Sequence, residues 1–240
     1  MTLETSVPRT LAERIDRVRQ LIADAAVHAG RSPSEVCLVA VSKTVDADQA
    51  LAAAELGIRH FGENRVQEAE EKIAVLAGRL PAGVQWHLIG HLQTNKARVA
   101  SGLFDMIESV DSVRLAQSLN RLAGERGAPL RILLEVNVAG EESKFGFAPN
   151  QLTEALAIIL DLPMLDVRGL MTVAPAVTNP EDARPVFRSL RELRDVLNAS
   201  VANAHLEELS MGMTHDFPVA IAEGATIVRV GRAIFGERRS

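Results

Sequence analysis

The chain has 240 residues, of which 47% are hydrophobic, so it suits one large domain or two small ones with a substantial core. Its formal net charge is −5, and no overall positive field favours nucleic acid as a partner. The single cysteine excludes an internal disulfide, and the sequence has neither a signal peptide nor the ~18-residue apolar run of a membrane span, so we expect a cytoplasmic protein.

The first predicted element is a helix that begins after Thr10 and stops at Gly30. Thr10 followed by Glu13 forms the pattern of a capping box. Apolar residues then recur at helical spacing, at Leu11, Ile15, Val18 and Ile22. We assign residues 1–35 to this helix and its lead-in.

From Val36 onward, short apolar or β-branched runs alternate with helical patterns. The expected strands are 37–42, 58–62, 85–89, 106–110, 131–138, 167–173, 208–211 and 226–231. The expected helices are 47–56, 65–79, 94–101, 112–125, 150–160, 181–200 and 216–223. Helix caps are expected at Asp46, Asp111 and Asn179, and helix ends at Gly57, Gly127 and Gly224.

Eight strands separated by helices, in a chain close to ~250 residues, are typical of a (β/α)8 TIM barrel. An open, doubly wound sheet is the competing α/β architecture. The eight units leave no remainder for a second domain, which favours the closed barrel. The sequence therefore predicts a single TIM-barrel domain over residues 1–240, with an extra N-terminal helix.

Lys43 follows the five apolar residues 37–41 of the first predicted strand. Because strand residues alternate in direction, Lys43 shares a side with Val39 and Val41. If that side is the barrel interior, Lys43 lies at the carboxyl-terminal mouth, where barrel active sites are found. Desolvation there favours a neutral amine, which is able to form a Schiff base. The alternative is a lysine that extends from a strand end into solvent.

The segments "LSMGMTHD" (209–216) and "TIVRVGRAIFG" (226–236) contain strands seven and eight with the loops that follow them. In this fold, those loops are the usual phosphate-binding region. Ser210 and Thr214 offer hydroxyls, and Gly212 and Gly231 let backbone N–H groups approach an anion. A phosphorylated ligand beside a Schiff-base lysine indicates pyridoxal phosphate or the substrate of a sugar-phosphate aldolase.

Arg229 separates these two ligands. In a closed barrel, strand eight pairs with strand one, so Arg229 and Lys43 become neighbours. A guanidinium is always charged and cannot move protons for an aldolase, but it can donate a hydrogen bond to a pyridine nitrogen. The alternative role for Arg229 is a structural ion pair, with Glu63 or Glu223 as the partner.

The motifs "VAVSKT", "FGENRVQE", "WHLIGHLQTNK", "GLMTVAP", "LSMGMTHDFPVAIAEG" and "VRVGRAIFG" together resemble the pyridoxal phosphate homeostasis protein family (YggS/PROSC-like). The resemblance covers about residues 35–237. It implies the barrel of fold-type III pyridoxal phosphate enzymes such as alanine racemase, without their second domain, and a role in vitamin B6 balance.

Carried over by motif, the resemblance makes Lys43 the Schiff-base lysine and places Asn64 near the cofactor ring. It implies that Ser210, Thr214 and Gly231 hold the phosphate and that Arg229 faces the ring nitrogen. Two positions depart from the family pattern: His91 stands where proline is frequent, and Arg232 stands where threonine is frequent.

The sequence contains no tyrosine, whereas racemases of this fold type use a lysine and a tyrosine as their two bases. A ring nitrogen that faces Arg229 is also a poor electron sink. We therefore expect a protein that binds pyridoxal 5'-phosphate and regulates its supply without significant turnover. The alternative is an amino-acid racemase or another pyridoxal phosphate enzyme of fold type III.

The expected partners are the cofactor and apoenzymes that accept it, with the protein itself a monomer or a weak homodimer. His60, His87 and His91 fall near strand ends and are candidates to line the mouth. His87 and His91 stand four residues apart, as metal ligands on a helix do, but Gly90 interrupts them and we expect no metal site. Lys144, in the loop after strand five, is expected to be a solvated lysine rather than a second cofactor acceptor.

Overall fold

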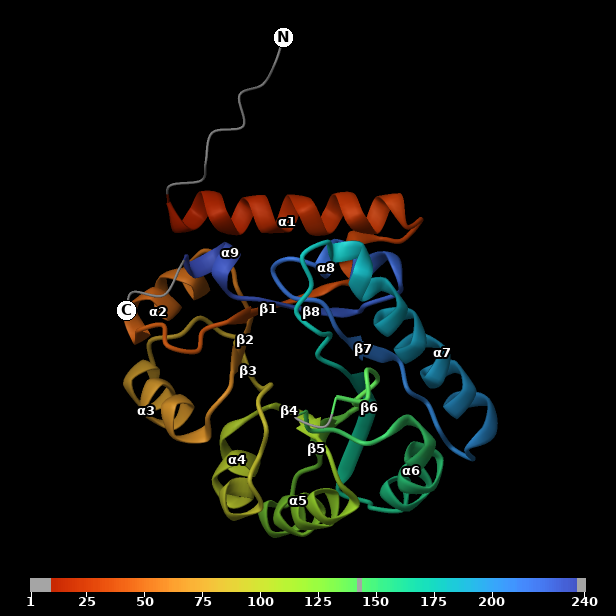
Figure 1. Ribbon diagram of the computed structural model, residues 1–240. Coiled ribbons are helices and arrows are strands. Elements are labelled where there is room, and N and C mark those ends of the chain that lie inside the picture. Colours follow the sequence, from red (N-terminus) through yellow and green to blue (C-terminus); the bar gives the residue numbers. More distant parts are fainter. Residues whose placement is uncertain (1–9, 142–143, 237–240) are drawn as a thin grey trace.

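The computed structural model describes residues 10–141 and 144–236. Within these residues, the strands are β1 (Cys37–Val41), β2 (His60–Glu63), β3 (Gln85–Leu88), β4 (Met106–Val110), β5 (Leu130–Glu135), β6 (Leu165–Met171), β7 (Glu208–Ser210) and β8 (Ile227–Val230). Each strand pairs in parallel with the next along the chain, and β8 pairs with β1 to close the barrel (Figure 1). The predicted TIM barrel is confirmed, and the open sheet is excluded.

Helices surround the strands (Figure 1). They are α1 (Leu11–His28), α2 (Ala47–Glu55), α3 (Val66–Leu76), α4 (Ala97–Leu103), α5 (Val113–Arg126), α6 (Leu152–Leu160), α7 (Arg184–Ser200), α8 (Phe217–Ala222) and α9 (Arg232–Phe235), with short 3₁₀ turns at 33–35, 94–96, 149–151 and 180–183. Over the described residues, no helix has the length and apolar character needed to cross a membrane.

The N-terminal helix α1 takes the place of a long helix after β8. The helix that follows β8 is α9, which has only four residues. α1 packs against α8 and α9 along the outside of the barrel (Figure 1). The Arg14 Nε atom donates to the carbonyl of Ile234 in α9, at 2.6 Å. The extra helix therefore covers the part of the barrel where its two ends meet.

Most of the predicted helix caps are confirmed. Thr10 and Glu13 form the capping box of α1, and Asp46 caps α2. Gly127 ends α5 in the left-handed conformation, with φ +74°. The expectation for Asp111 is wrong, because the hydroxyl of the next residue, Ser112, accepts the N–H of Leu115 and caps α5 instead.

The barrel interior combines apolar and polar side chains. Inward-facing apolar residues form one cluster, made of Val39, Met106, Leu133, Met171 and Ile227. A larger apolar core lies between the sheet and the helices. The interior also contains four buried polar residues, His87, Glu108, Ser210 and Arg229. Buried polar groups require hydrogen-bond partners, so these four constrain how the interior is arranged.

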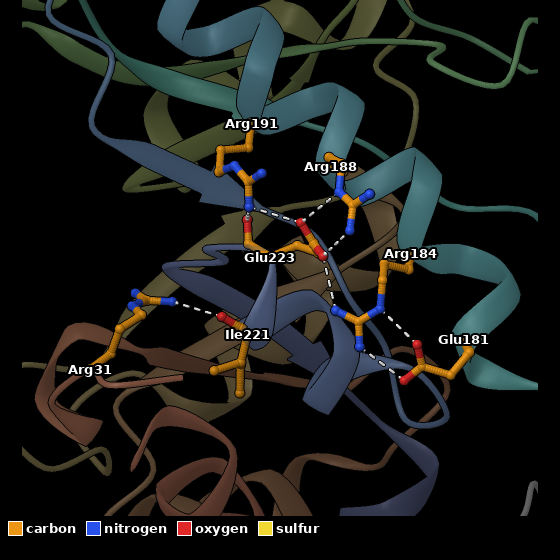
Figure 2. Close-up of polar contacts among 7 residues, drawn as sticks. All are labelled: Arg31, Glu181, Arg184, Arg188, Arg191, Ile221 and Glu223. Carbon is orange, nitrogen blue, oxygen red and sulfur yellow. Dashed lines mark hydrogen bonds and ion pairs between the residues drawn. The ribbon is translucent and has the colours of Figure 1, made fainter. Parts of the chain in front are cut away.

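Glu223 links the end of α8 to α7 (Figure 2). Arg184 Nη1, Arg188 Nη2 and Arg191 Nη1 lie 2.9, 3.2 and 2.8 Å from its carboxylate oxygens. Burial alone raises the pKa of Glu223, but these guanidinium groups hold it below its ordinary value. Arg31 adds a hydrogen bond to the Ile221 carbonyl, at 3.1 Å. These contacts fix α8 and with it the loop at 211–216.

Candidate functional site

Lys43 lies in a turn immediately after β1. The strand ends at Val41, and Lys43 is half-buried. Cys37 and Val39 belong to the apolar group inside the barrel, so alternation along β1 directs Val41 inward as well; the direction of the Lys43 side chain, in the turn beyond the strand, stays a prediction. The predicted position of Lys43 at the carboxyl end of the barrel agrees with this arrangement.

Helix α3 holds the turn on both sides of Lys43. Lys72 Nζ donates to the carbonyl of Ser42, at 2.6 Å, and Glu68 Oε1 accepts the N–H of Thr44. Thr44 itself has φ +63°, a left-handed conformation that is rare for a β-branched residue. Such strain persists where surrounding contacts enforce it and is concentrated at functional sites. The peptide groups before and after Lys43 are therefore fixed by side chains one helical turn apart.

Lys72 is held in turn by Glu63. The two side chains are 6% and 0% exposed, and Nζ lies 2.5 Å from Oε1. The Ser42 hydroxyl donates to the same oxygen, at 2.7 Å. Burial raises the pKa of Glu63, and the hydrogen bond from Lys72 opposes that rise. Glu63 thus stabilises the turn that contains Lys43, through Lys72 and Ser42, and is not an ion-pair partner of Arg229.

Arg229 lies inside the barrel and is 4% exposed. Its Nη1 atom donates to the Ser210 hydroxyl at 2.6 Å, and Nη2 donates to the Thr172 carbonyl at 2.8 Å. Ser210 donates in turn to Glu108 Oε2, at 2.5 Å. The alternative pairing with Glu223 is also absent, because Glu223 binds the arginines of α7.

The Arg229 guanidinium interacts through its charge with three acidic residues, Glu108, Glu135 and Asp216. Burial lowers the pKa of the guanidinium, and the three carboxyl groups oppose that effect. A guanidinium stays protonated even so, because its ordinary pKa lies far above neutrality. Arg229 can therefore donate hydrogen bonds to a ligand in the barrel mouth but cannot give up a proton.

The loop after β7 contacts Arg229, and the loop after β8 contacts β1. The backbone N–H of Arg229 donates to the Gly212 carbonyl, at 3.0 Å. A Cβ atom placed on Gly231 would stand 3.1 Å from the carbonyl oxygen of Val41 and 3.3 Å from its Cβ. Gly231 therefore lets β8 approach β1 closely, two residues before Lys43.

The phosphate role of the other predicted residues stays a prediction. Thr214 is half-buried in the turn before α8. The Ser210 hydroxyl already has two partners inside the barrel, Glu108 and Arg229. Because α8 and α9 have six and four residues, individual backbone N–H groups, rather than long helix dipoles, are the available anion donors.

Asn64 follows β2 and lies against the loop that follows β3. A Cβ atom on Gly90 would stand 2.3 Å from the Asn64 carbonyl oxygen, so only glycine permits this approach. Asn64, His91 and Lys96 line a cavity of about 370 Å³ between the two loops. Asn64 is thus at the carboxyl end of the barrel, just after β2, the strand that pairs with β1.

The structure clarifies two positions that depart from the family pattern. The His91 ring stacks on Phe145 with the ring centroids 3.6 Å apart, and its Nδ1 atom lies 2.9 Å from Asp111 Oδ2. Arg232 is exposed. Lys144, in the loop after β5, is half-buried and bonded to Glu141 and the Val173 carbonyl, so it is not simply a solvated lysine.

Two histidines do not lie where the sequence placed them. His60 is the first residue of β2 and, with His87, lines a cavity at the amino-terminal end of the barrel. The expectation that they line the mouth is wrong: His60 begins its strand, and the His87 ring is held between His60 and Glu108 inside the barrel. The sequence analysis also missed Glu108, Glu135 and Lys72, whose partners come from other strands or helices.

Residues 14–239 match the family model described as alanine racemase, N-terminal domain. The pyridoxal phosphate homeostasis protein of Aquifex aeolicus is 45% identical over 227 residues, which are 95% of this chain and 98% of that protein. The protein of the same name from Escherichia coli K12 is 39% identical over 235 residues, covering 95% and 97% of the two chains.

The structure is similar to that of PipY from Synechococcus elongatus PCC7942 with PLP bound. The TM-score is 0.84 at 40% identity, over 95% of this chain and all of that one. The alanine racemase of Clostridium difficile 630 has a TM-score of 0.72 at 16% identity, over 99% of this chain and 60% of that one. At that identity the match shows the shared fold.

Glu135 should make stability depend on pH. Burial, and next the charge of Asp111, raise the pKa of its carboxyl to about 7. Because the folded state keeps a proton that the unfolded state releases, this stabilisation is complete below the ordinary pKa and is lost as pH rises through about 7. Between pH 5 and pH 8 the cofactor-free protein should lose about 1 to 3 kcal/mol more than Glu135→Gln, since one pKa unit corresponds to ~1.4 kcal/mol.

Urea denaturation at the two pH values measures this difference. Glu154→Gln, a substitution at an exposed position of α6, is the control and should behave as the unsubstituted protein does. An equal loss of stability in the unsubstituted protein and Glu135→Gln would contradict the role given to Glu135.

Proposed function

This chain belongs to the pyridoxal phosphate homeostasis protein family, and from that membership we propose that it binds pyridoxal 5'-phosphate at the carboxyl end of its barrel. Lys43 is the residue that we propose as the Schiff-base anchor. The function that we propose is to hold and supply the cofactor within vitamin B6 homeostasis. The relatives that support this function are matched over nearly their whole length.

The observation that carries the proposal is the closure of the barrel between β1 and β8. Val39 pairs in register with Arg229, and Gly231 approaches Val41 closely. Lys43 follows Val41 by two residues, which supports a position for its amine near the glycine loop and the buried guanidinium. This arrangement supports the proposal that an amine, a backbone anion cradle and a hydrogen-bond donor share one mouth.

These groups fit the chemistry of the cofactor. Bound pyridoxal phosphate would supply an aldehyde for the amine of Lys43, a phosphate and a pyridine nitrogen. Backbone groups around Gly231 and the Thr214 hydroxyl would hold the phosphate, and Arg229 would donate to the ring nitrogen. Ser210 would donate to the phosphate only by exchanging its hydrogen bond to Glu108 for one to the ligand. Asn64, on the neighbouring strand, would lie beside the ring.

The same residues favour storage and delivery over turnover. Arg229 cannot protonate the ring nitrogen, so the ring would gain little capacity to accept electrons. The chain also has no tyrosine to act as a second base. The second candidate function is amino-acid racemisation or a related reaction, which the shared fold with alanine racemase favours.

We further propose that apoenzymes which need the cofactor are the partners and that the protein acts as a monomer or weak homodimer. The proposed compartment is the cytoplasm, which the single cysteine favours. The half-buried position of Lys43 supports delivery, because an acceptor must reach the anchored cofactor.

Lys43 should carry the cofactor covalently. Borohydride reduction of the loaded protein, followed by peptide mass spectrometry, should place the adduct on Lys43. Lys43→Arg, which retains the charge but is not expected to form the linkage, should give no adduct. An adduct on Lys96 or Lys144, with Lys43 unmodified, would refute the assignment.

The phosphate contacts should dominate cofactor affinity. A hydrogen bond to a charged group contributes about 1.5–3 kcal/mol, so Ser210→Ala and Thr214→Val should each weaken binding about tenfold or more. Gly231→Val should weaken it further, because its side chain would crowd Val41 and block the backbone. Absorption titrations measure these affinities, with exposed Thr153→Val as the control. Unchanged affinity in all three site variants would move the phosphate elsewhere.

A further inference from the structure

A second cavity lies at the amino-terminal end of the barrel, opposite Lys43. Its volume is about 720 Å³, larger than the cavity beside Asn64. The strand residues that line it belong to the beginnings of strands, among them Cys37, His60 and Glu208. Such a volume is in the range of small-molecule sites, which combine apolar walls with a few convergent polar groups.

Three residues from different strands line this cavity and carry polar atoms that have no hydrogen-bond partner within the described part of the chain. Glu208 Oε2 is buried and accepts no hydrogen bond within the described part of the chain. The Arg131 guanidinium makes one hydrogen bond there, from Nη2 to Gln85 Oε1 at 3.1 Å. His60 contacts His87 through Nδ1, at 3.0 Å, so its Nε2 atom remains available. Buried polar groups without partners call for an explanation.

The hydrogen-bond pattern determines what each group can accept. Glu108 Oε1 lies 2.7 Å from His87 Nδ1, so the N–H at Nδ1 donates a hydrogen bond to the carboxylate. We infer the tautomer in which His60 Nδ1 donates to His87 Nε2, one of the two arrangements that their 3.0 Å separation permits. Burial, and next the neighbouring His87, lower the pKa of His60 to about 4, so its ring is neutral near pH 7. In that tautomer His60 Nε2 carries no proton and is an acceptor.

The spare groups thus comprise two acceptors and one cationic donor. Glu208 Oε2 and His60 Nε2 suit a nitrogen that carries several N–H groups, and a positive charge strengthens both bonds. The planar guanidinium of Arg131 suits a carboxylate. A ligand that satisfies all three groups carries an anion and a cationic nitrogen in one small molecule.

A chain of hydrogen bonds links this cavity to Arg229. It runs from His60 to His87, from His87 to Glu108, from Glu108 to Ser210 and from Ser210 to Arg229, with separations of 3.0, 2.7, 2.5 and 2.6 Å. Hydrogen bonds in such a chain polarise one another. A cation that donates to His60 draws charge from Glu108 toward His87, which leaves Arg229 less neutralised and a stronger donor.

We propose that the amino-terminal cavity binds a small zwitterion through Arg131, Glu208 and His60, and that the hydrogen-bond chain couples its occupancy to tighter cofactor binding. The coupling half of this inference rests on the proposed function. The binding half does not, because it concerns residues at the other end of the barrel.

The binding half is tested on cofactor-free, isotope-labelled protein. The probe is 4-guanidinobutyrate, which carries a carboxylate and a guanidinium but no primary amine to react with an aldehyde. Its titration should shift NMR signals of residues that line the cavity, and should saturate with a Kd of about 1 mM or lower, in the range of weak small-molecule binding. Butyrate and methylguanidine, which each carry one of the two charges, should bind at least tenfold more weakly.

Substitutions then identify the groups involved. Arg131→Met and Glu208→Gln should each weaken the probe about tenfold or more, as expected when a charged hydrogen bond is lost. Arg98→Met, at an exposed position of α4, is the control and should leave probe affinity unchanged. Shifts that do not saturate, or that persist in both cavity variants, would overturn the site.

The coupling half is tested by measuring the affinity for pyridoxal phosphate with and without saturating probe. We expect the probe to tighten cofactor binding about fivefold or more, in the usual range of coupling between sites. By reciprocity, the loaded protein should bind the probe more tightly by the same factor. This second measurement needs no variant.

His87→Leu should abolish the coupling but keep probe binding, since both ring nitrogens of His87 serve the chain and neither is spare for the ligand. Equal cofactor affinity with and without probe would overturn the coupling. If the cofactor itself failed to bind, the proposed function would fall, while saturable probe binding would still support the cavity as a ligand site.

Discussion

The Arg229 guanidinium lies inside a closed barrel, where a charge is unfavourable unless partners compensate it. Ser210 and the Thr172 carbonyl accept its hydrogen bonds, and Glu108 balances its charge through Ser210. These partners come from β4, β7 and the end of β6, so one side chain on β8 constrains half the barrel. The polar interior follows from this requirement, and so does the position of the donor that would meet the cofactor ring.

The second constraint is the turn that contains Lys43. Lys72 and Glu68 hold the adjoining peptide groups, and Glu63 fixes Lys72 from behind. The ion pair of Glu63 and Lys72 is buried, so removal of one partner would leave an uncompensated charge. Since β8 closes the barrel against β1, the two constraints meet at one mouth. The strained, rigidly supported turn that contains Lys43 follows β1, and the buried guanidinium of Arg229 lies on β8, the strand paired with it.

Local pattern was sufficient to predict the barrel and the pairing of β8 with β1, which sets Arg229 opposite Val39. The side to which Lys43 points stays a prediction. Alternation along a strand and closure of eight strands are rules that act on the sequence directly. The partners of Arg229 could not be predicted in this way. Glu108 and Ser210 lie on strands that are not neighbours, and the β4–β5 pairing shifts register between Ile107 and Val110. His60 was assigned to the wrong end because the predicted strand began two residues before the observed β2.

The central claim is that the site holds its cofactor for delivery and does not turn over amino acids. The direct measurement is proton exchange at the α-carbon of alanine, followed by NMR in heavy water with the loaded protein, beside cofactor transfer to an apoenzyme. One acid–base group contributes about 10²–10⁴-fold to catalysis, so a site without the second base should show exchange near background together with efficient transfer. Exchange at enzymatic rates, on the order of 1–10³ s⁻¹, would contradict the account.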